Sequence, residues 1–506
     1  MWLLALLTLA GGALRFATLD LQSFWFDETA TVALVHMDLG GMLGEIPDSE
    51  STPPLYYVLA WLWAKAFGTG EVGLRSLSAL AGTLMIPAAY LAGAELVGRR
   101  AGLVVAALAA FNPLLFWYSQ EARAYALAAL LTTLAVLLFA RALRRPTGRT
   151  LALWALVSAL ALATHYFAVF VVAPTAGWLV VSGWRSEHRG RHLAAVLAPV
   201  AAALALLPLL LRQRSLDLAA FLRDEPLLER LVKAAKQGLV GFDAPLEQLA
   251  AASAGAIAGV AAVAALASAW RGAGERGRHA GDHEPTGVAL AGALALLAVA
   301  VPFALALAGA DYFGTRNLIV AWLPAAAVLA AGLARGRVGL AGTGALCAIG
   351  LTAIVGVAVV ERWQRDDWRS AAEALPPART ARAVVLSPAA GSKQPITLYS
   401  PGLSPLPPQP VVREVAFVSV VDRAAGGVHP PPPPRGRTPL IRRFVVVRRH
   451  EDDAYTVVLL RAPRPRSLSR VVLNAGRLLP ERDAALMLQR PLSAAGVARA
   501  RRRPGG

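Results

Sequence analysis

Long apolar segments recur through the first 360 residues and limit the possible folds of this chain more than any other feature. A helix needs roughly 20 mostly apolar residues to cross the hydrocarbon core of a bilayer. The chain is 56% hydrophobic and 16% charged, whereas soluble domains average about 25% charged residues. We therefore predict a mainly α-helical, polytopic membrane domain at residues 1–360. About eleven transmembrane helices are predicted, at approximately 1–19, 73–97, 102–118, 124–141, 150–164, 167–183, 193–211, 247–270, 287–309, 318–334 and 338–360.

The arginines of the short loops predict the orientation of these spans. Alternate loops contain 14 arginines, whereas the opposite short loops contain little beyond Lys65, Arg75, Arg123 and Arg316. Cytoplasmic loops are enriched in Lys and Arg, so the arginine-rich set is predicted to lie inside. The N-terminus is then cytoplasmic, and the end of the chain lies outside. The longer loop at 212–246 departs from this pattern because it would place six basic residues outside.

Two segments have alternative interpretations. Residues 53–63 could be a span, which would reverse every later loop, but their short length and their Tyr and Trp content favour a helix lying at the membrane interface. We predict a second interfacial helix at 29–43, in the same outer loop at 20–72. Residues 1–19 could instead be a cleaved signal peptide, but they lack a basic start, and Arg15 interrupts the apolar run.

The rest of the chain differs in composition from the membrane domain. From residue 361 onward it contains 25 Arg or Lys and 11 Asp or Glu, a net +14 of the whole-chain charge of +18. A predicted helix at 361–375 and short apolar runs after it indicate an extracytoplasmic α/β module at 361–490. Residues 491–506 are predicted to be a disordered basic tail, and its outer location excludes nucleic acid as a partner. The predicted strands are 384–386, 411–420, 444–447 and 456–460.

The predicted outer loops are short but carry unusual polar residues. Asp27 and Glu28 are adjacent carboxylates directly after the first span, where charge beside a membrane costs free energy. A carboxylate at headgroup level suits proton abstraction from an acceptor hydroxyl, and a cation or metal ion suits a leaving phosphate. These residue types therefore predict transfer of a group from a lipid phosphate. Further candidates in or beside these loops are Arg15, Glu121, Arg123, Tyr125, His165, Tyr166 and Arg316.

Structural explanations compete with the chemical one at each position. Asp27 and Glu28 could stabilise the start of a helix, through its dipole or as a cap. Glu121 could simply form an interfacial ion pair with Arg123. Anchoring at the interface is the alternative for Arg15, His165 and Arg316, and a solvated loop is the more typical setting for Asp48 and Glu50.

A series of motifs in a fixed order resembles one known family. The motifs are Trp25-Phe26-Asp27-Glu28, Pro53-Pro54-Leu55-Tyr56-Tyr57, Leu74-Arg75-Ser76-Leu77-Ser78-Ala79-Leu80, Asn112-Pro113 with Trp117-Tyr118-Ser119-Gln120-Glu121-Ala122-Arg123-Ala124-Tyr125, and Thr164-His165-Tyr166-Phe167. Together they resemble the bacterial glycosyltransferase family 39 proteins of the GT-C superfamily. That group is related to protein O-mannosyltransferases and to the aminoarabinose transferases that modify lipid A. The resemblance covers roughly residues 10–375 and is strongest before residue 175.

This resemblance implies a GT-C fold, a polyprenyl-phosphate-sugar donor, an active site on the outer face and inversion at the anomeric carbon. Asp27 matches the family's catalytic carboxylate, which acts there as general base, and Glu28 is its motif partner. Glu121 matches a further acidic residue of the same cavity. The resemblance leaves a divalent metal ion open and implies no other cofactor. Substrate or phosphate contacts are implied for Arg15, Arg123, Tyr125, His165, Tyr166 and Arg316.

The chain departs from the family pattern at two places. Many relatives have His-Pro-Pro in the first outer loop, where this chain has Thr52-Pro53-Pro54, so any role of that histidine is absent or is filled by Glu50 or His36. Relatives often have Arg-Tyr where this chain has Arg316-Asn317, which weakens the assignment of Arg316.

The hypothesis from the sequence is a glycosyltransferase of the bacterial cytoplasmic membrane. It would move a mannose-like hexose or a pentose from polyprenyl phosphate to an outer acceptor, such as a cell-envelope glycan, lipid or protein. A transporter or flippase of lipid-linked sugars is the alternative, but it should show internal repeats and polar residues in the middle of its spans. An inactive relative is a further alternative, against which the intact Asp27-Glu28 pair argues.

Overall fold

The computed structural model describes most of the chain and divides it into two compact units. The first unit comprises Met1–Leu19, Leu34–Phe67 and Gly73–Val357, and the second comprises Asp20–Ala33, Gly68–Val72 and Ala358–Gly506. The backbone alone is described at 270–275 and 284–286, and the predicted tail at 491–506 lies outside the described residues except for residue 491. The described residues are 2–184, 189–275, 284–388, 391–400, 402–421, 429–430, 443–468, 473 and 485–491.

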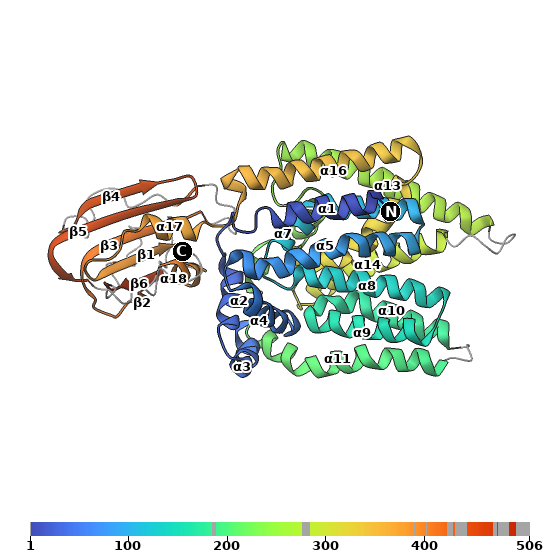
Figure 1. Cartoon of the computed structure of the whole chain (residues 1–506), viewed down its shortest axis with the longest axis horizontal. Helices are drawn as coiled ribbons and strands as arrows, with labels where there is room; N and C mark the ends of the chain where they lie inside the picture. The colour runs from blue at the N-terminus through green and yellow to red at the C-terminus, as the bar shows by residue number, and fades with distance from the viewer. Residues whose placement is uncertain are drawn as a thin grey trace. The chain divides into compact units, whose positions relative to one another are not determined.

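Apolar helices lying side by side make up most of the first unit (Figure 1). Within the described residues, seven helices are long and apolar enough to cross a membrane, and an eighth span results if the bent pair α6 and α7 counts as one. Three shorter apolar helices stand at the remaining predicted positions, Trp2–Phe16, Gly148–Thr164 and Asn317–Leu333. The mainly helical, polytopic fold is thereby confirmed. The main helices are α1 (Trp2–Phe16), α5 (Glu71–Leu96), α6 (Arg99–Phe111), α7 (Pro113–Ser119), α8 (Tyr125–Arg144), α9 (Gly148–Thr164), α10 (Val169–Gly183), α11 (Arg189–Ser215), α13 (Glu247–Glu275), α14 (Glu284–Leu307), α15 (Trp322–Leu333) and α16 (Gly336–Val359).

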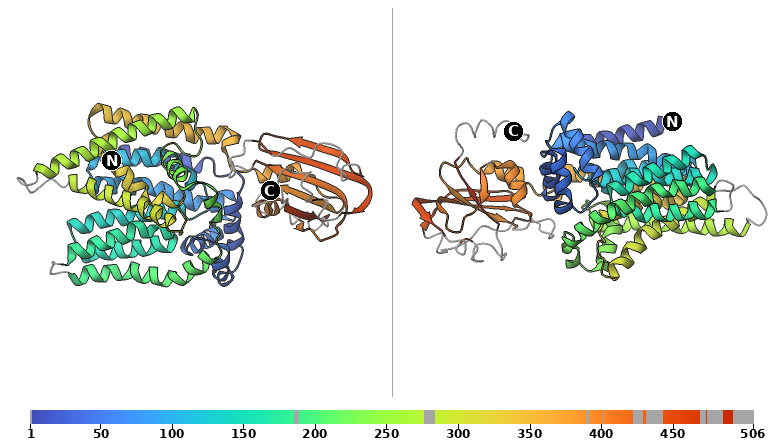
Figure 2. Two further views of the ribbon diagram at one scale, coloured as in Figure 1. Left: turned by 180° about the vertical axis from the view of Figure 1, so that it is seen from behind. Right: turned by 90° about the horizontal axis from the view of Figure 1, so that it is seen from below.

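The outside of this bundle is apolar, as a lipid-facing surface requires. Leu197 and Leu204 of α11 are 65% and 64% exposed, and Val260 of α13 is 72% exposed. The views of Figure 2 show α8 to α11, in teal and green, as a layer of neighbouring helices. Exposure of this many apolar side chains to water would be unfavourable, whereas their contact with lipid acyl chains is favourable.

The predicted span at 102–118 is broken, and the break has a clear cause. α6 ends at Phe111, and α7 begins at Pro113 after a bend of 55°. Proline donates no backbone hydrogen bond and therefore suits the first position of a new helix. The Asn112 side chain caps α7 by accepting from the Leu115 backbone N–H at 3.0 Å. The Asn112 amide also donates to the Gly238 carbonyl at 2.8 Å.

The first outer loop contains three short helices where the sequence predicted two. α4 (Leu55–Phe67) has 13 residues, about 20 Å of helix, which is too short to cross a core about 30 Å thick. The predicted helix at 29–43 was wrong in its bounds, since it is replaced by α2 (Phe26–Val35) and α3 (Leu39–Ser49). The helical segment is interrupted between them because the Asp38 carboxylate caps the start of α3 by accepting from the Gly41 N–H at 2.7 Å.

The loop after α11 folds into two helices that the sequence did not predict. They are η2, a short 3-10 helix (Ala220–Asp224), and α12 (Leu227–Val240). The bidentate pair of Arg230 with Asp311, at 2.8 and 2.6 Å, joins α12 to the loop after α14. The hydrogen bond from Arg230 keeps the pKa of the Asp311 carboxyl below its usual value. α12 ends at Val240 and is followed by Gly241, whose φ of +83° favours glycine, and a Cβ there would meet Pro113 at 2.9 Å.

The second unit contains a six-stranded sheet among its described residues, in the order β2-β6-β1-β3-β5-β4. β1 and β3 are parallel neighbours, and the other pairs are antiparallel. The sequence missed β2, β6 and α18, and the helix predicted at 361–375 is instead η4 followed by α17. The elements are η4 (Glu361–Trp363), α17 (Trp368–Ala374), β1 (Arg382–Ser387), α18 (Lys393–Tyr399), β2 (Leu403–Pro405), β3 (Val411–Val420), β4 (Val445–Glu451), β5 (Tyr455–Ser467) and β6 (Ala485–Gln489).

Candidate active site

Asp27 and Glu28 occupy the first turn of α2 and belong to the second unit. Asp27 is half-buried, whereas Glu28 is fully buried. The Glu28 carboxylate accepts a long hydrogen bond of 3.4 Å from the Trp25 backbone N–H, one residue before the helix begins. A carboxylate at the third helical position that reaches back in this way stabilises a helix start. Glu28 thus has a structural function, and Asp27 is the more accessible of the two carboxylates.

A buried ion pair lies in the first unit between Arg123 and Glu50. The two guanidinium nitrogens of Arg123 lie 2.9 and 2.8 Å from the two Glu50 oxygens. Tyr57 donates to Glu50 at 2.6 Å, and its hydroxyl lies 2.8 Å from that of Thr52. Burial, as the largest cause, raises the pKa of Tyr57 well above its usual value. The expectation of a solvated Glu50 was wrong, since Glu50 is 2% exposed.

Thr52 and Tyr57 were missed as parts of a site, whereas Glu50 was named only as a possible replacement for the histidine of related sequences. Glu50 lies two residues before Thr52, the residue that replaces the histidine of related sequences. The sequence allowed Arg123 to pair with Glu121, its near neighbour, and the structure shows an ion pair of Arg123 with Glu50. Glu121 is fully buried in the turn between α7 and α8, and its carbonyl accepts from the Arg123 backbone N–H at 2.7 Å.

Arg15 is 1% exposed, and it packs against the end of α6. Its guanidinium donates to the carbonyls of Gly11, Ala110 and Ala109 at 2.9, 3.1 and 2.9 Å. It also donates to the Ser119 hydroxyl at 3.1 Å. Carbonyls at a helix C-terminus lack partners within the helix and attract positive charge. These contacts favour a packing function for Arg15 over the predicted contact with phosphate.

His165 lies between α9 and the 3-10 helix η1 (Tyr166–Ala168) and is 2% exposed. Burial, supplemented by the positive charges of Arg316 and Arg123, lowers its pKa to about 3. His165 is therefore neutral at physiological pH. Its Nδ1 accepts from the Phe167 backbone N–H at 3.2 Å, so the proton is on Nε2. Among the described residues, this buried Nε2–H has no hydrogen-bond acceptor.

Two tyrosines that the sequence predicted as substrate-binding residues lie near His165. The ring centroid of Tyr125 lies 5.7 Å from that of His165 and 4.8 Å from that of Tyr118. The Tyr166 hydroxyl donates to the Gln213 side chain of α11 at 2.8 Å. Gln213 in turn donates to the Thr52 carbonyl at 3.3 Å. The structure thus joins His165 and its neighbours to the first outer loop.

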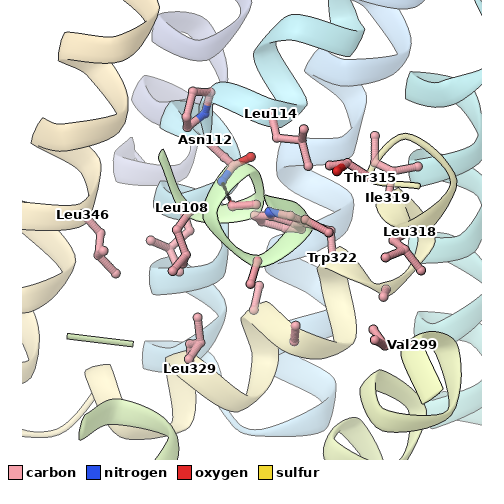
Figure 3. A pocket seen from close by; sticks show the side chains of 18 of the residues that line it. Leu108, Asn112, Leu114, Val299, Thr315, Leu318, Ile319, Trp322, Leu329 and Leu346 are labelled. Atoms are coloured by element: carbon pink, nitrogen blue, oxygen red, sulfur yellow. Dashed lines mark hydrogen bonds between the residues drawn. The ribbon is translucent and has the colours of Figure 1, made fainter. Parts of the chain in front are cut away.

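An apolar cavity of about 250 Å³ lies in the first unit (Figure 3). The guanidinium carbon of Arg316 lies 5.1 Å from the centroid of the Phe221 ring. The neighbouring residue, Thr315, lines the cavity together with residues of α6, α7, α12, α15 and α16. Figure 3 shows the side chains of Leu108, Trp322 and Leu329 directed toward this common space. The cavity is apolar along most of its wall, and its lining residue Thr315 is followed in the chain by Arg316.

The described side chains that could bind a metal ion do not cluster into a metal site. In the parts of the chain that the structure describes, no group of three or more His, Cys, Asp or Glu is arranged to hold a metal ion. A divalent ion in the reaction therefore stays a prediction of the sequence resemblance. No chemical step below depends on one.

Comparison with known proteins finds one family model and several solved structures that are similar to parts or most of this chain. Residues 51–211 match the model of the family described as dolichyl-phosphate-mannose-protein mannosyltransferase. The crystal structure of ArnT from Cupriavidus metallidurans bound to undecaprenyl phosphate is 12% identical, with a TM-score of 0.50 over 90% of this chain and 97% of that chain. This chain therefore shares its fold with ArnT. The resemblance predicted from its motifs is confirmed, and so is the predicted GT-C fold.

More distant comparisons add little. The apo oligosaccharyltransferase of Archaeoglobus fulgidus is 14% identical, with a TM-score of 0.46 over 74% of this chain and 57% of that chain. Such a score is too low to indicate a common topology by itself. No curated protein matches this chain by sequence.

Proposed function

We propose that this protein transfers a sugar from a polyprenyl-phosphate carrier to an acceptor outside the cytoplasmic membrane. The observation on which the proposal rests is an apolar cavity in the first unit, one of whose lining residues is followed directly by an arginine. Thr315 lines the apolar cavity, and Arg316 follows it directly. The charges of Arg316 and Arg123 both act on His165. An amphiphile with an apolar tail and an anionic head matches this combination.

His165, Arg316 and Arg123 supply hydrogen-bond donors and positive charge for a phosphate. The Nε2–H of neutral His165 can donate a hydrogen bond to an anion, and the imidazole does not need to gain a proton first. Arg316 and Arg123 both supply positive charge, and the Arg123 guanidinium also pairs with Glu50 at 2.8 Å. In a buried setting such fixed donors stabilise the charge that develops on a leaving phosphate. Arg123 then has mainly an orienting function, and His165 and Arg316 contact the phosphate.

Asp27 is the proposed general base. It takes the proton of the acceptor hydroxyl while that oxygen bonds to the anomeric carbon. The bond between this carbon and the phosphate oxygen breaks, and the oxygen leaves with the electron pair as part of polyprenyl phosphate. Attack opposite to the leaving group inverts the anomeric configuration. ArnT supports a lipid donor of this kind, because its crystal structure contains undecaprenyl phosphate.

The test uses purified protein in nanodiscs with a set of labelled polyprenyl-phosphate sugars, among them mannosyl and pentosyl carriers. We expect label to move to an added envelope acceptor or to water, with release of polyprenyl phosphate and an inverted anomeric centre in the product. His165→Ala should raise the dissociation constant for polyprenyl phosphate. Movement of intact lipid-linked sugar across proteoliposomes, without any release of polyprenyl phosphate, would instead establish the transporter alternative.

A further inference from the structure

The segment that carries Asp27 is held by the C-terminal part of the chain. Asp20–Ala33 belongs to the same compact unit as Gly68–Val72 and Ala358–Gly506. In that segment, Gln22, Ser23 and Phe24 are 5%, 2% and 2% exposed. These residues precede Asp27 by three to five positions, so their backbone determines where α2 begins and where its first-turn carboxylates point.

One set of contacts leads from Phe24 to α18. The Phe24 backbone N–H donates to the Tyr399 hydroxyl at 2.7 Å, and Tyr399 is the last residue of α18. The Tyr399 hydroxyl donates its own proton to the Glu71 carboxylate at 2.7 Å. Arg369 of α17 lies 3.3 Å from the same Glu71 oxygen. This chain of hydrogen bonds fixes the peptide three residues before Asp27 through a single tyrosine hydroxyl.

A second set of contacts holds the residues just before Phe24. The Ser23 hydroxyl donates to the Asp366 carbonyl at 2.8 Å and accepts from the Trp368 N–H at 3.2 Å. The Gln22 side chain accepts from the Arg365 N–H at 2.8 Å. Arg369 donates to the carbonyls of Asp20 and Leu21 at 2.9 and 3.2 Å. All five residues 20–24 are therefore hydrogen-bonded to residues 365–369 or to Tyr399.

We propose that Tyr399 is a positioning residue for the carboxylate pair of α2, and that the C-terminal module contributes to catalysis by holding this segment. The inference rests on the proposed function for its catalytic part. A general base works only when its oxygen lies within hydrogen-bond reach of the acceptor hydroxyl. A misplacement of about 1 Å can lower a rate on the order of 100-fold. The extra module thus has a function in the reaction without contributing a reacting group.

The test compares two tyrosines of the same unit. Tyr399→Phe removes the hydroxyl that joins Phe24 to Glu71, and Tyr455→Phe removes a hydroxyl that lies 3.1 Å from His450. For Tyr399→Phe we expect faster hydrogen exchange of the Phe24 amide, a kcat lowered on the order of 10- to 100-fold and an unchanged KM for the donor. Tyr455→Phe should leave exchange at Phe24 and kcat at wild-type values.

A second pair of variants keeps the inference falsifiable if Tyr399→Phe folds poorly. Glu71→Gln retains an oxygen that accepts from Tyr399, so this variant should keep most of the wild-type kcat. Glu71→Ala removes that oxygen and should lower kcat as Tyr399→Phe does. Unchanged exchange at Phe24 in Tyr399→Phe would overturn the inference, as would faster exchange with wild-type kcat. If the wild type transfers no sugar, the proposed function fails, but the exchange result still decides whether Tyr399 holds the segment.

Discussion

Two carboxylates in the first outer loop, only two residues apart, differ sharply in environment. Glu50 is buried and pairs with buried Arg123, whereas the side chains of Asp48 and its partner Arg212 are 52% and 58% exposed. Removing one partner of a buried pair leaves an uncompensated charge, which costs about 3–5 kcal/mol. Exposed pairs contribute roughly 0–1 kcal/mol. Local sequence did not distinguish the two residues, because their partners, Arg123 and Arg212, are both distant in sequence.

We therefore expect Glu50→Ala to lower the free energy of unfolding by about 3–5 kcal/mol and Asp48→Ala to lower it by no more than about 1 kcal/mol. The double variant Glu50→Ala/Arg123→Met should regain much of the loss, because it removes the unpaired charge. Thermal and denaturant unfolding in detergent would measure all three. Equal effects of Glu50→Ala and Asp48→Ala would contradict the buried pair.

The depressed pKa of His165 predicts a pH dependence of stability. The unfolded chain binds a proton at His165 below its ordinary pKa of 6.5, whereas the folded protein does so only near 3. Protons therefore favour the unfolded state as pH falls from 6.5 toward 3, and stability falls by up to about 1.4 kcal/mol per pH unit. This contribution is fully present above pH 6.5.

The variant His165→Asn should remove this dependence. Asn keeps an oxygen that can accept from the Phe167 N–H but has no titrating group. Unfolding midpoints measured between pH 7.5 and 5 should fall less steeply for the variant than for the wild type. Identical slopes would show that His165 is not buried as a neutral group.

At the scale of elements, α12 forms a wall of the apolar cavity although its loop was predicted without a helix. Leu231, Ala235 and Leu239 line the cavity, whereas Glu229 is exposed on another side of the same helix. The spans were predictable because long apolar runs have few alternatives. α12 was missed because its 14 residues mix charged and apolar side chains and are too few to resemble a membrane span. The Arg230–Asp311 contact that holds it joins residues far apart in sequence.

Filling the cavity from α12 should weaken donor binding. We expect Ala235→Trp to raise the KM for a polyprenyl-phosphate sugar about 10-fold, equivalent to about 1.4 kcal/mol, with kcat little changed. Glu229→Trp adds the same side chain to the same helix away from the cavity and should leave KM unchanged. An equal change in both variants would mean that the cavity is not the site of the lipid tail.

At the scale of the whole molecule, the sequence predicted the membrane domain and the later module but not how the chain is shared between units. Asp20–Ala33 and Gly68–Val72 group with the C-terminal residues, from which they are separated by more than 280 positions. Such grouping depends on tertiary contacts, such as those of Tyr399, and leaves no periodic trace in sequence. The proposed orientation, with the N-terminus inside, rests on loop arginines.

Single cysteines would test that orientation. In a Cys347→Ala background, Gly44→Cys and Gly148→Cys are a matched pair, because both glycines are exposed and a Cβ at either meets no atom within 4 Å. A membrane-impermeant maleimide should label Gly44→Cys in intact cells and Gly148→Cys only after permeabilisation. Labelling of both cysteines in intact cells would show that residues 53–63 cross the membrane and reverse every later loop, and the reverse pattern would show that the whole orientation is inverted.

The central claim is that Asp27 is the base of a sugar transfer from polyprenyl phosphate. The most direct measurement is transfer of radiolabel from polyprenyl-phosphate sugars in membranes that contain equal amounts of wild type, Asp27→Asn or Asp20→Asn. Asp20 is an exposed carboxylate in the same segment and serves as the control. We predict transfer by the wild type and Asp20→Asn, and a loss on the order of 100-fold or more for Asp27→Asn. Transfer by Asp27→Asn at the wild-type rate would contradict the account.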